Sequence, residues 1–217
     1  MISTERRDWT VLLVGGPSGT GKSTVAKHIG RQFGASWLQV DDLRLALQWS
    51  HASLPTPEET AALYFFEETP DVLRLPAERL RDGLIGVGRA LSPALEKVID
   101  THIAVAEPVV IEGDAILPSL VARPRLRAHV TGGHMQAIFV VEPEESAILA
   151  NLLDRGRGIA GYTDAELRTR ARAYWLYGHW LAEEARRHGL PVLESRPWET
   201  LVERVVTATT LPAQQRQ

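Results

Sequence analysis

Residues 16–23 read Gly-Pro-Ser-Gly-Thr-Gly-Lys-Ser and match the pattern G-x-x-x-x-G-K-[ST] at every fixed position. This pattern is typical of a loop that holds the phosphates of a nucleoside triphosphate, because glycines let backbone N–H groups approach phosphate oxygens. We expect Lys22 to reach the β- and γ-phosphates and the Ser23 hydroxyl to ligate Mg²⁺. The residues predicted to bind the nucleotide in this segment are Gly16, Pro17, Ser18, Gly19, Thr20, Gly21, Lys22, Ser23 and Thr24.

The sequence on either side of the loop supports this interpretation. The run Thr10–Val14 predicts a strand before the loop, and apolar spacing predicts an amphipathic helix over Lys22–Phe33. A helix that begins at Lys22 presents free N–H groups and the positive end of its dipole to an anion. The alternative is a glycine-rich turn with an exposed lysine, and the flanking strand and helix favour the phosphate loop.

Further along the chain, short β-branched runs alternate with helical periods, which is typical of an α/β sheet. We predict a P-loop NTPase fold, with a five-stranded, mostly parallel, doubly wound sheet. Residues 1–217 are interpreted as a single domain, with a helical substrate region over 55–106 and a lid loop over 154–163. The four strands predicted after the first are Trp37–Val40, Pro108–Ile111, Gln136–Val141 and Pro191–Leu193.

Local signals place the helices. Pro70, Pro76 and Pro93 are expected to cut the middle region into separate helices, because proline interrupts helical hydrogen bonding. Thr163 and Glu166 have the spacing of a capping box, so a long helix is expected after Thr163. Further helices are predicted over residues 42–49, 144–153 and 199–207.

Composition excludes several classes of protein. The chain of 217 residues has 24 Lys and Arg against 27 Asp and Glu, so bulk charge does not favour nucleic acid binding. It has no cysteine, which excludes disulfides, thiolate metal sites and cysteine nucleophiles. The polar N-terminus does not resemble a signal peptide, and no apolar run is long enough to cross a membrane. We therefore expect a cytoplasmic protein that binds neither nucleic acid nor membrane.

Two acids follow the second predicted strand. Ligands of open α/β sheets gather beyond the carboxyl ends of strands, so Asp41 or Asp42 could accept the proton of an attacking hydroxyl or orient it. The alternative is that one of them caps the next helix, and Asp42 is better placed for that role. We predict both as catalytic candidates and prefer Asp41. Asp41 and Arg44 are also predicted to contact the substrate, with Arg44 gripping an anionic group.

The run Val109–Val110–Ile111–Glu112–Gly113–Asp114 is an apolar strand followed by two acids around a glycine. We expect this strand to lie beside the one that precedes the phosphate loop. Glu112 is predicted to bind Mg²⁺ together with Ser23, and Glu112 and Asp114 are both predicted to contact the substrate. The alternative is a strand end with solvated acids.

Residues 154–161 form a glycine- and arginine-rich segment between two predicted helices. A hinged lid there could close over ATP and exclude water, which would otherwise compete with the acceptor hydroxyl. Arg155 and Arg157 are predicted to stabilise the transferring phosphoryl group. The alternative is a surface loop.

Four further arginines have two expected roles. Arg168, Arg170 and Arg172 fall on the long helix after Thr163, where helical spacing lets only some of them point inward, and the solvated face is the favoured position for them. Arg196 follows the last strand and is predicted to bind the nucleotide by stacking on adenine.

The residues 15–24, 40–44 and 110–113 resemble the corresponding segments of P-loop small-molecule kinases. The closest likeness is to 2-phosphoglycerate kinase-like proteins, and the zeta-toxin and chloramphenicol phosphotransferase group is more distant. The resemblance implies phosphorylation that depends on ATP and Mg²⁺, with Lys22 and Ser23 on the nucleotide and an aspartate near the acceptor. Residues 50–106 match no substrate-binding pattern, so the acceptor is not specified.

Taken together, these patterns predict an ATP-dependent phosphotransferase that acts on a hydroxyl of a small polar metabolite, and the resemblance implies one similar to 2-phosphoglycerate. One alternative is a regulatory protein that binds a nucleotide and hydrolyses it slowly. Another is a toxin-like kinase paired with an antitoxin.

Overall fold

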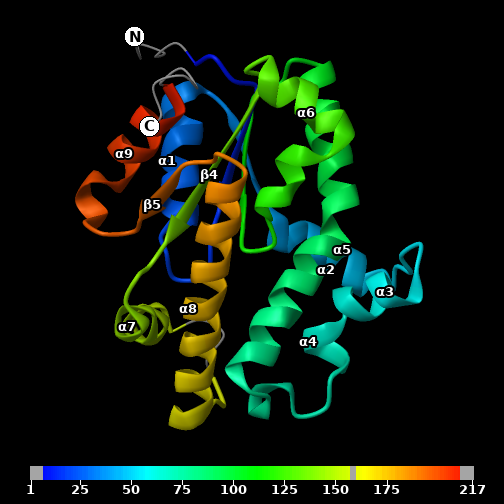
Figure 1. Ribbon diagram of the computed structural model, residues 1–217, viewed down its shortest axis with the longest axis vertical. Helices are drawn as coiled ribbons and strands as arrows, with labels where there is room; N and C mark the ends of the chain where they lie inside the picture. The colour runs from blue at the N-terminus through cyan, green and yellow to red at the C-terminus, as the bar shows by residue number, and fades with distance from the viewer. Residues whose placement is uncertain (1–6, 157–159, 211–217) are drawn as a thin grey trace.

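The computed structural model describes residues 7–156 and 160–210, which fold around one sheet of five parallel strands (Figure 1). The strand order is β2-β3-β1-β4-β5, so the predicted α/β class and sheet are confirmed. Gly15 pairs with Gly113, and Glu112 pairs with both Val14 and Gln39, which places the ends of three strands at one edge. The strands are β1 (Val11–Gly15), β2 (Ser36–Gln39), β3 (Val109–Gly113), β4 (Met135–Val141) and β5 (Val192–Glu194).

Helices cover both faces of the sheet. On one face lie α1 (Lys22–Phe33) and α9 (Leu201–Thr210), and on the other lie α5 (Ala77–Ala104) and α8 (Asp164–Arg187) (Figure 1). Successive strand residues point to opposite faces, so Leu12 and Val14 pack with α1, while Val11 and Leu13 pack towards α5 and α8. This arrangement buries β1 completely and holds the loop that follows it on a rigid base.

The second strand begins and ends one residue earlier than predicted, because the chain passes directly from β2 into α2 (Val40–Trp49). Gln39, with an extended backbone, is the N-cap of this helix. Asp42 therefore lies inside the first turn, and the interpretation of Asp42 as the cap is wrong. Both Asp41 and Asp42 occupy this first turn, where a negative charge is favourable beside the positive end of the helix dipole.

The middle region is helical, as predicted, but Pro93 does not divide it. Pro93 lies inside α5, which continues unbroken for 28 residues. Leu91, Leu95 and Ile99 are fully buried on either side of the proline, so packing offsets the lost hydrogen bond. Pro76 is the N-cap of α5, where a proline is well tolerated. The preceding elements are α3 (Pro57–Leu63), α4 (Phe65–Glu68) and the 3-10 helix η1 (Val72–Arg74).

The capping box before α8 is confirmed, because the Thr163 backbone N–H donates to Glu166 and the Glu166 N–H donates to the Thr163 hydroxyl. The segment η2 (Pro118–Ala122) and α6 (Pro124–Thr131) follow β3 and were not predicted. The remaining elements are α7 (Glu145–Arg155) and η3 (Trp198–Thr200).

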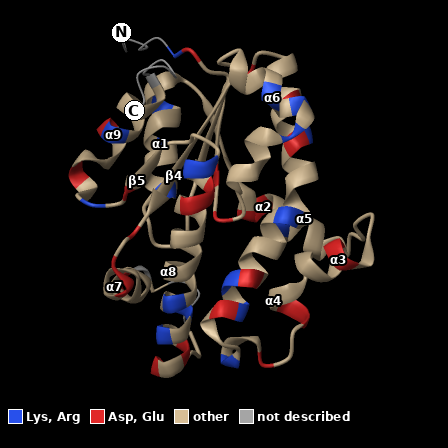
Figure 2. Ribbon diagram, in the orientation of Figure 1, with Lys and Arg blue, Asp and Glu red and all other residues tan. Residues whose placement is uncertain are grey.

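Charged residues are distributed over the helices. In Figure 2, acidic and basic positions are mixed along α5 and α8. Within the described ranges, each helix is either too short or too polar to cross a membrane.

Candidate active site

The loop between β1 and α1 has the backbone of an anion cradle. Gly16, Gly19 and Gly21 have φ angles of +145°, +87° and +80°, which favour glycine. A Cβ atom on Gly16 would lie 2.0 Å from the Val140 carbonyl oxygen, so this position accepts only glycine. Gly21 is the N-cap of α1 and has no side chain that could cap the helix. The first N–H groups of α1 therefore remain suited to binding an anion.

Lys22 is folded over this loop. Its side chain is buried, and Nζ donates a hydrogen bond to the Pro17 carbonyl oxygen at 2.9 Å. The Thr20 hydroxyl donates to the same oxygen at 2.9 Å. A phosphate would offer the ammonium group a stronger, charge-assisted partner than a neutral carbonyl. Thr24 is exposed in the first turn of α1.

Glu112 lies beside the start of α1. It is only 4% exposed, and the Ser23 side chain forms a hydrogen bond with it. Burial raises the pKa of Glu112, while the nearby Lys22 charge and the Ser23 hydrogen bond act in the opposite direction. A carboxylate and a hydroxyl oxygen are the kind of ligand that Mg²⁺ prefers. Ser23 and Glu112 therefore fit the metal position predicted for them.

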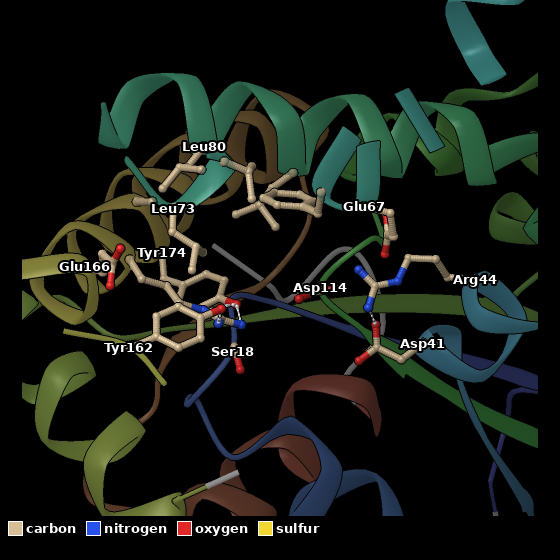
Figure 3. A pocket seen from close by; sticks show the side chains of 15 residues that line it. Ser18, Asp41, Arg44, Glu67, Leu73, Leu80, Asp114, Tyr162, Glu166 and Tyr174 are labelled. Carbon is tan, nitrogen blue, oxygen red and sulfur yellow. Dashed lines mark hydrogen bonds and ion pairs between the residues drawn. The ribbon is translucent and has the colours of Figure 1, made fainter. Parts of the chain in front are cut away.

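A cavity of about 610 Å³ opens next to the loop, and Ser18 forms part of its wall (Figure 3). Asp41, Arg44 and Asp114 line the cavity, and an Arg44 nitrogen lies 3.2 Å from an Asp41 oxygen. Burial is the main cause that raises the pKa of Asp114, and the negative charge of Asp41 raises it further. Asp42 is exposed and lies outside the set of described residues that line this cavity.

Arg170 lies at another side of the same cavity. Its guanidinium donates hydrogen bonds to the hydroxyls of Tyr162 and Tyr174, and it lies over both rings. Burial alone would lower the pKa of Arg170, but Tyr174, Tyr162 and the nearby Asp114 more than compensate and raise it.

The expectation that Arg170 is on the solvated face is therefore wrong. Arg168 and Arg172 are exposed, as expected, and Arg172 pairs with Glu145 at 3.0 Å. A sequence signal for Arg170 existed, because it lies four residues before Tyr174 and next to the apolar stripe of α8.

Arg196 belongs to a network beside the phosphate loop. Its Nε donates to buried Glu142 at 3.1 Å, and another nitrogen donates to the Asn151 side-chain oxygen at 3.3 Å. Asn151 in turn donates to the Gly19 carbonyl oxygen at 3.0 Å. The Arg196 guanidinium also lies 5.7 Å from the centre of the Trp198 ring, which covers Gly21. Sequence reasoning did not identify Glu142 or Asn151.

The predicted lid is only partly described. Arg155 is the last residue of α7, while Arg157 lies outside the described residues. The structure therefore brings together the phosphate loop, Glu112, Asp41, Arg44 and Asp114, without placing the two lid arginines.

Neither a known family profile nor a curated protein sequence matches this chain. Solved structures with a similar fold include a shikimate kinase from Acinetobacter baumannii in complex with shikimate, at 13% identity and a TM-score of 0.48, covering 94% of this chain and 96% of that one. A gluconokinase from Sinorhizobium meliloti 1021 has 18% identity and a TM-score of 0.46, and the match covers 94% of this chain and 93% of the gluconokinase chain. A sugar kinase from Janibacter sp. HTCC2649 has 18% identity and a TM-score of 0.49, and the match covers 95% of this chain and 97% of the sugar kinase chain. At these identities the similarity concerns the fold, and these three structures do not confirm the narrower resemblance to 2-phosphoglycerate kinase-like proteins.

Proposed function

We propose that this protein is a kinase that uses ATP and Mg²⁺ to phosphorylate a hydroxyl group of a small molecule. The observation that carries the proposal is that Ser18 of the phosphate loop lines the same cavity as Asp41 and Asp114. A phosphate donor held in the loop would therefore face the carboxylates that can handle an acceptor hydroxyl. A nucleotide-binding regulator would not need this second, acidic cavity.

The phosphate loop supplies binding and charge. Backbone N–H groups of the loop and of the first turn of α1 would bind the phosphate oxygens. Lys22 would exchange the Pro17 carbonyl for the β- and γ-phosphates. Ser23 and Glu112 would hold Mg²⁺, directly or through water, and the bound ion would neutralise phosphate charge.

Asp41 is the proposed acceptor carboxylate. It is 52% exposed in the cavity and can reach a bound molecule, and the Arg44 guanidinium stabilises its negative charge. Asp41 would orient the acceptor hydroxyl and take its proton as the bond to phosphorus forms. Asp114 lines the same cavity and can form a hydrogen bond with the acceptor, and burial raises the pKa of this carboxyl group.

Three arginines are proposed to bind the nucleotide or the transferring phosphoryl group. Arg196 lies next to Gly19 through Asn151, which supports a role at the nucleotide. Arg155 and Arg157 would bring positive charge to the phosphoryl group when the lid closes, and closure would exclude water.

The test is ATP consumption by the full chain with and without a panel of hydroxyl compounds, together with detection of the phosphorylated product. A kinase releases ADP faster with its acceptor and forms a stoichiometric phosphate ester. A regulatory ATPase has the same slow rate with every compound. Lys22→Ala should abolish both nucleotide binding and product formation, and equal ATP affinity in this variant would overturn the assignment of the loop.

A further inference from the structure

The cavity beside the phosphate loop has a hydrocarbon wall that the transfer reaction does not use. Figure 3 shows Leu73 and Leu80 on the side of the cavity away from Ser18. The wall is built from four separate helical elements, so it is a feature of the cavity rather than of one helix face. Its members are Phe66, Val72, Leu73, Leu80, Leu84 and Ala173.

Part of this wall is accessible to solvent. Phe66, Val72 and Leu73 are only half-buried, although each side chain is wholly hydrocarbon. Apolar side chains that line a concave site are typical of ligand pockets, in which they cover an apolar part of the ligand. The volume of about 610 Å³ also exceeds the needs of a three-carbon acceptor, which would leave much of this wall in contact with water.

The charges around the cavity restrict the acceptor further. Among the described residues that line it, four carry carboxyl groups (Asp41, Glu67, Asp114 and Glu166) and two carry guanidinium groups (Arg44 and Arg170). Arg44 is already paired with Asp41. An acceptor with several negative charges would therefore meet an excess of acidic groups.

We infer that the acceptor is an uncharged amphipathic alcohol with a ring or an aliphatic chain. This inference rests on the proposed kinase function and specifies its substrate class. The acceptor hydroxyl lies at Asp41, and the apolar body lies against Leu73, Leu80 and Phe66. The acceptor oxygen forms a bond to the γ-phosphorus while the bond from that phosphorus to the bridging oxygen of ADP breaks, and the hydroxyl proton passes to Asp41.

Binding of three probes tests the inference without relying on turnover. The full chain is saturated with Mg²⁺ and a non-hydrolysable ATP analogue and titrated in a calorimeter. The probes are 3-phenoxypropane-1,2-diol, glycerol and 2-phosphoglycerate. We expect the phenoxy compound to bind about tenfold more tightly than either of the others, because its ring buries apolar surface. Equal affinities, tightest binding of 2-phosphoglycerate, or no binding of the phenoxy compound would overturn the inference.

A matched pair of variants locates the effect. Leu73→Ser should weaken binding of the phenoxy compound about fivefold to tenfold, since Leu73 lines the cavity. Leu75→Ser is the control, because Leu75 is also half-buried and packs against the cluster of Ala77, Leu80 and Ala173, but is not itself among the described residues that line the cavity. Leu80→Ala, on a different helix, should repeat the loss. Unchanged binding in both cavity variants would contradict the inference.

The same samples separate this inference from the proposed function. If glycerol or another polar compound is phosphorylated while the phenoxy compound does not bind, the substrate class is wrong and the kinase function stands. If the phenoxy compound binds in a manner that depends on Leu73 but ATP does not bind the wild-type loop, the kinase function is wrong and the apolar site stands.

Discussion

The Asn151 side chain donates a hydrogen bond to the Gly19 carbonyl oxygen at 3.0 Å, although the two residues are 132 positions apart. This contact ties α7 to the phosphate loop. The same asparagine accepts a hydrogen bond from Arg196, whose guanidinium is held by buried Glu142. The helix that leads into the predicted lid is therefore connected to the backbone expected to surround the phosphates.

The first prediction concerns this contact. Asn151→Asp removes the donor to Gly19 but keeps an oxygen for Arg196. We expect ATP to bind about threefold to tenfold more weakly, because one hydrogen bond contributes about 0.5–1.5 kcal/mol. Calorimetric titration with Mg·ATP measures the effect. Unchanged ATP affinity in this variant would show that the contact does not shape the loop.

The second prediction separates the two neighbouring acids. Asp41→Asn should lower kcat by about 10²- to 10⁴-fold, since Asp41 lines the cavity and is proposed to take the acceptor proton. Asp42→Asn is the matched control and should change kcat less than twofold, because Asp42 is exposed outside the cavity. Both are measured as acceptor-dependent ADP release. A larger loss with Asp42→Asn would reverse the assignment.

The third prediction concerns pH and Glu112. Its pKa in the folded protein is raised above the ordinary value of 4.5, mainly by burial. The folded state therefore binds the proton more tightly than the unfolded state, and the stability contributed by this proton is lost as pH rises above 4.5. Glu112→Gln removes this loss. We expect the free energy of unfolding of the wild type, relative to that of the variant, to fall between pH 4 and pH 7, as measured by urea denaturation without nucleotide.

The same variant has a second expected outcome. Glu112→Gln should weaken the Mg²⁺ dependence of ATP binding, because it replaces a charged ligand. A wild-type curve that runs parallel to the variant curve over this pH range would contradict the pKa shift, and unchanged Mg²⁺ dependence would contradict the metal assignment.

The fourth prediction concerns the loop backbone. Gly16→Ala places a Cβ atom 2.0 Å from the Val140 carbonyl oxygen at a φ of +145°. We expect a loss of about 3 kcal/mol or more in unfolding free energy. Gly133→Ala is the control, since Gly133 has a φ of +78° and no described atom within 4 Å of such a Cβ. It should cost about 1–2 kcal/mol. Equal losses in thermal denaturation would contradict the crowding at Gly16.

Local sequence signals were sufficient for the sheet and for the loop. The motif over residues 16–23 predicts the start of α1, because the glycine-rich loop and the first helical residues are adjacent in the sequence, and apolar spacing predicts its end at Phe33. The Thr163–Glu166 capping box is equally local and is confirmed. The prediction that Pro93 separates two helices is wrong, because the burial of α5 on both sides of the proline outweighs one missing hydrogen bond.

The residues that line the cavity for the acceptor could not all be predicted from local sequence signals. The spacing of Arg170 and Tyr174 on α8 is a local signal, but which side of α8 faces the cavity depends on its packing against α5, which is a tertiary arrangement. The Asn151–Gly19 contact joins distant segments and leaves no periodic signal. The apolar wall around Leu73 comes from several helices whose relative positions the sequence does not specify.

The most direct test of the central claim is a crystal structure of the full chain with Mg²⁺ and a non-hydrolysable ATP analogue. The account predicts the triphosphate within the loop of residues 16–23, Lys22 Nζ on the β- and γ-phosphates instead of the Pro17 carbonyl, and the γ-phosphate facing the cavity with Asp41. An empty loop, or an analogue bound elsewhere with Lys22 still on Pro17, would contradict it.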